Sequence, residues 1–233
     1  MNKNGIYFNV IMWTGVAVLA VWYLTTPSRY DVFSEEQLFD YSYKDMSILV
    51  VTPTLTANAY REPGFYNYYN QTCGEECLSV DLDPDIPYNY MSSRNAVELF
   101  KRLEANMITD YELSMNVGIV RDYDKIILLH NEYVTKEMFY ELTNHPNVIY
   151  LYPNALHAEV EITNGTMTLV QGHGYKGRDN GFLWQYDNTR PYEYDVFCAP
   201  YSWIDIPNGK QLDCYPERYM LKFPQIIQVV RDI

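Results

Sequence analysis

Hydrophobic residues occur in runs of different length along this chain, and the longest run lies near the start. Residues 6–24 read IYFNVIMWTGVAVLAVWYL and include no charged side chain. A helix of that length reaches about 28 Å, close to the hydrocarbon thickness of a bilayer. Tyr7, Trp22 and Tyr23 lie near its two ends, where aromatic rings favour the headgroup level. We therefore predict one transmembrane helix over 6–24, after a short cytoplasmic end at 1–5.

A cleaved signal peptide is the alternative interpretation of this run. The apolar stretch of a signal peptide is usually about 7–15 residues long and leads to a cleavage pattern of small residues. The sequence TTPSRYD after position 24 lacks that pattern. We expect an uncleaved anchor, followed by a polar stalk over residues 25–46.

Three short apolar runs rich in β-branched residues follow the stalk, and they are typical of buried strands. They are SILVVT at 47–52, KIILLH at 125–130 and NVIYLY at 147–152. Amphipathic stretches separate these runs. Strands that alternate with helices through short connections indicate an α/β fold, in which helices cover a parallel sheet.

Two of the amphipathic stretches have recognisable helix ends. Ser92 or Ser93 can cap a helix that runs through Ala105, and Thr135 can cap a second one. The His-Pro pair at 145–146 stops the second helix.

The last third of the chain has a different pattern. Two alternating stretches, 159–163 and 166–171, flank Asn164-Gly165, which is a strong signal for a β-hairpin. Loop-rich sequence follows position 172, and residues 220–230 form either a closing strand or a helix. We expect a single α/β domain over 47–233 with an irregular C-terminal region.

Charge and cysteine content bear on where this domain lies. The formal net charge is −13, which argues against a nucleic-acid partner. The cysteines are even in number and fall in two close pairs, Cys73/Cys77 and Cys198/Cys214, as an oxidising compartment favours. Proximity favours these two disulfides, although four cysteines allow three connectivities.

Two glycosylation sequons point the same way. They begin at Asn70 and Asn164, both in turn-like sequence. With the cysteines, they predict an extracytoplasmic glycoprotein domain and a cytoplasmic N-terminus.

Polar side chains follow all three predicted strands. In open α/β sheets, ligands bind outside the carboxyl ends of the strands. The segments concerned are 53–61, 130–133 and 153–157, so their side chains are expected at one edge of the sheet. The alternative is that strand ends are polar simply because they meet loops.

These segments also resemble a known family. LTANAYREPGFYNYY, DYDKIILLHNEYVTKEMFYEL and NVIYLYPNALHAEV are similar to three blocks of the C-terminal domain of the dimethylformamidase large subunit. That domain is related to the class I glutamine amidotransferases, and the resemblance covers roughly residues 47–160. It implies a three-layer α/β fold of the flavodoxin/glutamine-amidotransferase-like kind.

The resemblance also implies a site and a chemistry. Tyr60 and Glu132 match ligands of a mononuclear iron, and hard anionic oxygens suit a ferric ion that acts as a Lewis acid. His130 and Asn154 match positions that orient or polarise a small amide substrate. A second tyrosine ligand is not assigned. The candidates for it are Tyr41, Tyr43, Tyr66 and Tyr69.

The sequence departs from the family pattern at several positions. The family's aspartate is Asn131 here, its tryptophan is Val134, and its Gly-Gly element is replaced by residues 62–64. A downstream catalytic glutamate is not identified.

Other chemistries are weaker in this sequence. Cys73 and Cys77 lack the spacing and the second pair of a metal site, so a small disulfide loop is favoured. A phosphate-binding loop must lead into a helix, and the glycine-rich stretch 172–177 precedes no predicted helix. His145 and His157 are interpreted as structural or solvated.

Two functions follow from these observations. The first is a non-catalytic binding or assembly module with no cofactor, whose partner is a protein of a cell-envelope or membrane complex. The second is an iron-dependent hydrolase of small amides.

Overall fold

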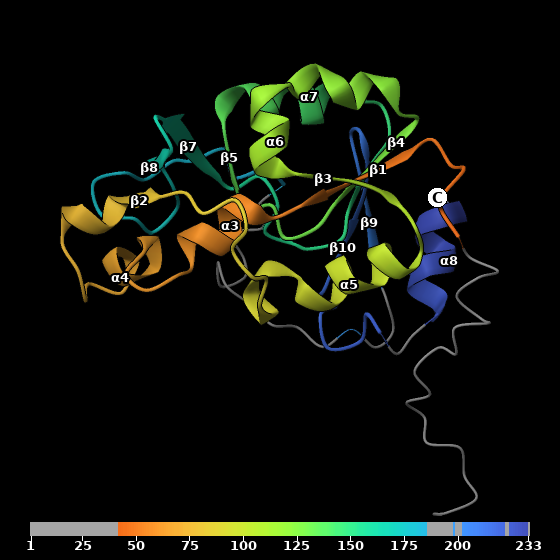
Figure 1. Cartoon of the computed structure of the whole chain (residues 1–233), viewed down its shortest axis with the longest axis horizontal. Helices are drawn as coiled ribbons and strands as arrows, with labels where there is room; N and C mark the ends of the chain where they lie inside the picture. Colours follow the sequence, from red (N-terminus) through yellow and green to blue (C-terminus); the bar gives the residue numbers. More distant parts are fainter. Residues whose placement is uncertain (1–41, 186–197, 199–201, 222–223, 233) are drawn as a thin grey trace, which may run out of the picture.

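In the computed structural model, which describes residues 42–185, 198, 202–221 and 224–232, a six-stranded sheet occupies the centre of the chain (Figure 1). The first five strands across this sheet are parallel, and the last is antiparallel to its neighbour. In spatial order the strands are β3 (Asn106–Thr109), β1 (Ile48–Thr52), β4 (Lys125–Leu128), β6 (Val148–Tyr150), β10 (Gly209–Leu212) and β9 (Trp203–Ile206). The predicted parallel sheet is confirmed.

Helices cover both faces of this sheet, which makes three layers (Figure 1). On one face lie α6 (Asp110–Met115) and α7 (Lys136–Asn144), and on the other lie α5 (Arg94–Arg102) and α8 (Pro224–Asp232). Each face of the sheet has its own hydrophobic core. The first core lies under α6 and α7, and the second lies under α5 and α8. Side chains alternate across a strand, so Val51 packs in the first core and Val50 in the second.

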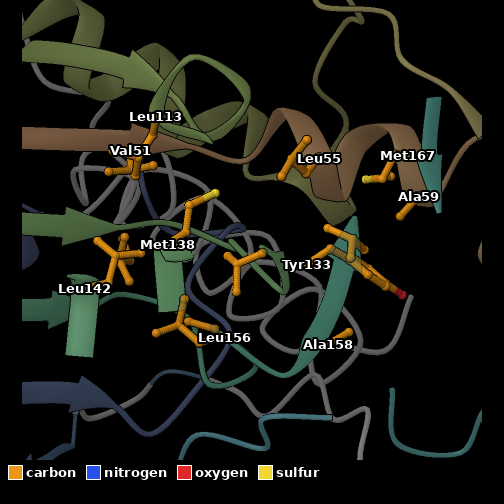
Figure 2. Close-up of a cluster of buried hydrophobic side chains, with 14 of the residues drawn as sticks. Val51, Leu55, Ala59, Leu113, Tyr133, Met138, Leu142, Leu156, Ala158 and Met167 are labelled. Carbon is orange, nitrogen blue, oxygen red and sulfur yellow. The ribbon is translucent and has the colours of Figure 1, made fainter. Parts of the chain in front are cut away.

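A second, four-stranded sheet extends the first core. In spatial order its strands are β2 (Ser79–Asp81), β8 (Thr166–Gln171), β7 (Ala158–Thr163) and β5 (Tyr133–Val134). Figure 2 shows Met167 and Tyr133 of this sheet close to Leu55 and Ala59, which belong to α3 (Thr54–Ala59). The two sheets therefore share one hydrophobic core.

The predicted hairpin is confirmed. Strands β7 and β8 pair in antiparallel fashion around Asn164 and Gly165, which have φ angles of +52° and +79°. A two-residue turn that matches the twist of its strands requires positive φ at both positions, and Asn-Gly provides it at low cost.

Four shorter elements connect these parts. They are α4 (Phe65–Tyr69) and the 3-10 helices η1 (Glu75–Leu78), η2 (Tyr90–Ser92) and η3 (Val117–Asp122).

The two predicted helices begin differently. Thr135 caps α7 as expected, because its side chain accepts a hydrogen bond from the backbone N–H of Met138, and α7 ends before His145. Ser93 precedes α5 but does not cap it. Its hydroxyl instead accepts the backbone N–H of His130 at 3.1 Å. The helix also ends at Arg102, short of Ala105.

Both predicted disulfides, Cys73–Cys77 and Cys198–Cys214, are formed. They are consistent with an oxidising compartment. Of the two alternatives for 220–230, the structure has a helix, α8, over Pro224–Asp232. The sequon residues Asn70 and Asn164 are both exposed.

The predicted transmembrane helix at 6–24 lies outside the described residues, as does most of the stalk. No helix within the described part of the chain is long and apolar enough to cross a membrane.

Candidate functional site

The strand order reverses between β1 and β4. From β1 the chain moves to β3 on one side, whereas β4 and β6 continue on the other. Open α/β sheets bind ligands outside the carboxyl ends of the strands at such a switch point. Here α3 follows β1 and leads to Tyr60, while His130 and Glu132 follow β4. Three of the sequence-predicted residues thus lie at the switch point.

The side chains of these three residues meet. The Tyr60 hydroxyl donates a hydrogen bond to Oε2 of Glu132 at 2.5 Å. The Nε2 atom of His130 lies 3.7 Å from the same carboxylate oxygen. Glu132 is 0% exposed and His130 is 1% exposed. We call this group of three residues the Glu132 cluster.

The hydrogen bonding of His130 fixes which ring nitrogen carries the proton. Its Nδ1 atom lies 2.5 Å from the backbone oxygen of Met91. A carbonyl oxygen only accepts, so Nδ1 carries the proton and Nε2 presents its lone pair. Nε2 is buried and makes no hydrogen bond within the described part of the chain. Burial lowers the pKa of His130 to about 4, so the ring is neutral near pH 7.

Aromatic rings enclose His130. Its ring stacks with Tyr60 and Tyr152 at centroid distances of 6.2 and 5.7 Å and meets Tyr215 edge-on at 5.4 Å. The Tyr215 hydroxyl donates to the backbone oxygen of Tyr90 and lies 3.3 Å from His130 Nδ1. The imidazole is thus held in one orientation.

Asn154 does not join the cluster through hydrogen bonds. It follows β6 and is 7% exposed. Within the described part of the chain, no hydrogen bond links its side chain to Tyr60, His130 or Glu132. The contacts of the described residues thus join Tyr60, His130 and Glu132, and they leave the role of Asn154 a prediction.

The candidates for a second tyrosine ligand fall in different places. Tyr66 packs against Tyr60 with a ring-centroid distance of 5.1 Å and stacks on Tyr69 at 5.4 Å. Tyr43 belongs to the core on the other face of the sheet and donates to the backbone oxygen of Ile227. Tyr41 lies outside the described residues. Tyr66 is the candidate nearest to Tyr60 by ring contact.

Sequence reasoning missed Asp110, which directly follows β3 and bonds to residues next to the cluster in the chain and in α3. One carboxylate oxygen accepts the backbone N–H of Leu55, and the other accepts Nδ2 of Asn131. Asp110 is fully buried, and this burial raises its pKa to about 7. The capping-box pattern from Thr109 to Glu112 was the local signal that could have located it.

Glu217 was also missed. Its carboxylate accepts the backbone N–H of Asn95 at 2.5 Å and the hydroxyl of Tyr152 at 2.7 Å. It therefore takes over the capping of α5 that was expected of Ser93. Burial raises its pKa. Glu217 follows a loop-rich stretch, and no local sequence pattern predicts its role as a cap.

The donor atoms of the Glu132 cluster are of the kind that bind a hard cation. A phenol oxygen, a carboxylate oxygen and an unprotonated imidazole nitrogen converge, and His130 Nε2 has no hydrogen bond. Among the described residues, no three side chains of His, Cys, Asp or Glu form a metal-binding group. A metal here would therefore depend on the Tyr60 oxygen.

Residues given a structural interpretation behave in that way. His145 Nε2 donates to the backbone oxygen of Tyr123 and its Nδ1 accepts the backbone N–H of Asn147, and His157 is 1% exposed in the core. The glycine-rich stretch 172–177 places Tyr175 in the core, where its hydroxyl meets that of Tyr133 at 2.6 Å.

The comparisons with known proteins add no family to this picture. No protein-family model matches the chain, and no curated protein matches it either.

Proposed function

We propose that this chain is a membrane-anchored extracytoplasmic α/β module that binds a protein partner in a cell-envelope or membrane complex and does not catalyse a reaction. One observation carries the proposal. The Glu132 carboxylate is fully enclosed, and its Oε2 atom is already engaged by the Tyr60 hydroxyl. The hydrogen bond between these two side chains links the end of α3 to the segment after β4.

Other features support the parts of this proposal. Numbered along the chain, the five parallel strands have the order 2-1-3-4-5, which is that of flavodoxin-like folds. This order supports the flavodoxin/glutamine-amidotransferase-like assignment. The two disulfides support the extracytoplasmic placement, and the apolar run at 6–24 supports the anchor.

A second candidate is an iron-dependent amide hydrolase, and a specific observation favours it. The lone pair of His130 Nε2 faces a carboxylate oxygen at 3.7 Å and makes no hydrogen bond. Two electron-rich atoms placed in this way are stabilised by a cation or a proton between them. Tyr60 and Glu132 would hold the iron, which supplies Lewis-acid polarisation of an amide carbonyl. His130 and Asn154 would orient the substrate.

Metal analysis of the purified full-length protein separates the two candidates. The binding module has no stoichiometric iron and does not hydrolyse small formamides after incubation with ferric or ferrous salts. The hydrolase holds about one iron per chain and shows a visible tyrosinate-to-iron absorption band.

Two matched tyrosine variants make the test sharper. In the hydrolase, Tyr60→Phe removes the visible band, whereas Tyr66→Phe preserves an oxygen donor at position 60 and retains the band in weakened or full form. Bound iron that depends on Tyr60, together with amide turnover, would refute the binding-module proposal.

The anchor has its own test. N-terminal sequencing of the membrane-extracted protein should begin at Met1 or Asn2. A sequence that begins at or after Thr25 would show a cleaved signal instead.

A further inference from the structure

A cleft with a volume of about 470 Å³ lies beside the four-stranded sheet. None of the residues that line it belongs to the Glu132 cluster. One wall comes from α6, through Tyr111, Ser114 and Met115, a second from the start of α7, and the third from the β7–β8 hairpin over 159–165.

The backbone edge of β7 is open along this cleft. On one side β7 pairs with β8 along its length. On the other side it pairs with β5 at Ala158 and Glu159 only, because β5 is two residues long and the chain then turns into α7. Over 160–163 no other strand in the described part of the chain pairs with this side. Unpaired strand edges are templates for the addition of another strand.

The charged side chains around this edge are mostly acidic. Glu137, Glu159 and Glu161 line the cleft with a single cation, Lys136. Within the described residues, none of these four side chains makes an ion pair or a side-chain hydrogen bond. Other exposed glutamates do, for example Glu98 with Arg102. The cleft therefore has a net negative charge that its own residues do not neutralise.

An apolar contact is also available. Met115 is 67% exposed, the largest fraction among the large hydrophobic side chains of the described chain, and it lies at the wall of the cleft. Open backbone, unneutralised carboxylates and an exposed methionine thus converge on one groove.

We propose that this cleft binds an extended, lysine- or arginine-rich segment of a partner protein, which adds to the 160–163 edge of β7 as a strand. The inference rests on the proposed function, because it names the chemistry of the partner that the module binds. Main-chain hydrogen bonds supply affinity that does not depend on side chains, and the glutamates select cationic side chains over acidic ones.

The test is a titration of full-length protein with a short fluorescent peptide of alternating valine and lysine, followed by fluorescence anisotropy. We expect saturable binding that weakens as salt is raised, because exposed charges are screened. The variant Glu137→Gln/Glu159→Gln/Glu161→Gln should bind about tenfold more weakly, because it loses three ion pairs with the lysines of the peptide.

A matched control separates the cleft from the overall charge of the protein. Asp85, Glu98 and Glu104 are three exposed acidic residues that lie outside the cleft. The variant Asp85→Asn/Glu98→Gln/Glu104→Gln removes the same amount of charge, and we expect it to bind the peptide as tightly as the unmodified protein.

A second peptide separates strand addition from charge attraction. The same peptide with alternate amides N-methylated keeps its lysines but cannot complete the ladder, so we expect at least a tenfold loss of affinity. Equal binding of both peptides, an equal effect of the two triple variants, or no binding at all would each overturn the proposal. Self-association that the cleft variant abolishes would instead identify a second copy as the occupant and overturn it too.

These titrations measure neither iron nor amide turnover. A failure of the peptide proposal is therefore distinguishable from a failure of the binding-module proposal.

Discussion

Glutamates lie both at the end of β4 and along the edge of β7, but water reaches only the second group. Glu132 is fully buried and accepts the Tyr60 hydroxyl, whereas Glu161 is exposed in the cleft. A buried carboxylate costs free energy unless donors satisfy it. The difference teaches that place in the fold, more than residue type, decides whether a carboxylate holds structure or is available to a partner.

Titration separates the two regions further. In and near the Glu132 cluster, burial lowers the pKa of His130 to about 4 and raises that of Asp110 to about 7. Stability should therefore respond to pH through the buried region. The cleft should instead respond to salt, because Glu137 and Glu161 are exposed and Glu159 is only half-buried.

The largest expected effect is the pH dependence that Asp110 causes. Its pKa of about 7 in the folded protein lies above its ordinary value of 3.8. Between these values the folded state binds more protons than the unfolded state, so the free energy of unfolding falls as pH rises from about 4 to 7. The contribution is about 4 kcal/mol.

Asp110→Asn isolates this contribution from that of His130, which acts in the opposite direction. The Asn131 amide can rotate to offer its Oδ1, which has no hydrogen bond, to the new amide. Urea denaturation at pH 4 and pH 7 should give the free energy of unfolding of both proteins. The difference between variant and unmodified protein should shift by about 4 kcal/mol in favour of the variant as pH rises from 4 to 7. A parallel pH dependence of the two proteins would contradict this account.

The next effect concerns the disulfide beside the buried region. Cys214 precedes Tyr215, which contacts His130. The Cys198–Cys214 bond spans 16 positions and the Cys73–Cys77 bond spans 4. In the chain-entropy model, replacing the first pair with alanine costs about 3 kcal/mol and replacing the second about 2 kcal/mol. Urea unfolding of both double variants measures these losses. A larger loss for the Cys73–Cys77 variant than for the Cys198–Cys214 variant would contradict the prediction.

Truncation of Glu132 tests the buried region directly. Glu132→Ala removes the acceptor of the Tyr60 hydroxyl and leaves space in the core, so we expect a loss of about 2–3 kcal/mol in the free energy of unfolding. Tyr60→Phe keeps the buried carboxylate but removes the hydroxyl that donates to it, so we expect a cost at least as large. A change below about 0.5 kcal/mol for Glu132→Ala would place the carboxylate in water, contrary to the structure.

The smallest effect is expected in the cleft. Glu161→Ala should change the free energy of unfolding by less than about 0.5 kcal/mol, because the side chain is exposed and unpaired within the described residues. The same variant should bind the lysine peptide more weakly. A large loss of stability would show that Glu161 has a structural role and would erase the contrast with Glu132.

Much of the fold could be predicted because its signals are local. The runs at β1, β4 and β6 are short, apolar and β-branched, and the cap at Thr135 and the Asn-Gly turn depend on adjacent residues. By contrast, β3 is half-buried at the sheet edge and β10 reads GKQL, so neither has an apolar run. Both are strands because a neighbouring strand completes their hydrogen bonds.

The candidate site divides in a similar way. The positions of Tyr60, His130 and Glu132 after β1 and β4 were sufficient to predict that they share the carboxyl edge of the sheet. The sequence did not decide whether the Asn154 side chain reaches the cluster, because its position depends on the path of the loop after β6.

The sequence by itself determined the alternation of strands and helices, the hairpin and the pairing of neighbouring cysteines, since each depends on residues close together in the chain. Only the tertiary structure decided that Ser93 supports His130 while Glu217 caps α5, and that the edge of β7 stays open beside three glutamates. These contacts join residues far apart in sequence. Local preferences cannot encode them, because the free energy that selects them comes from burial and from hydrogen bonds formed only once the sheets are packed.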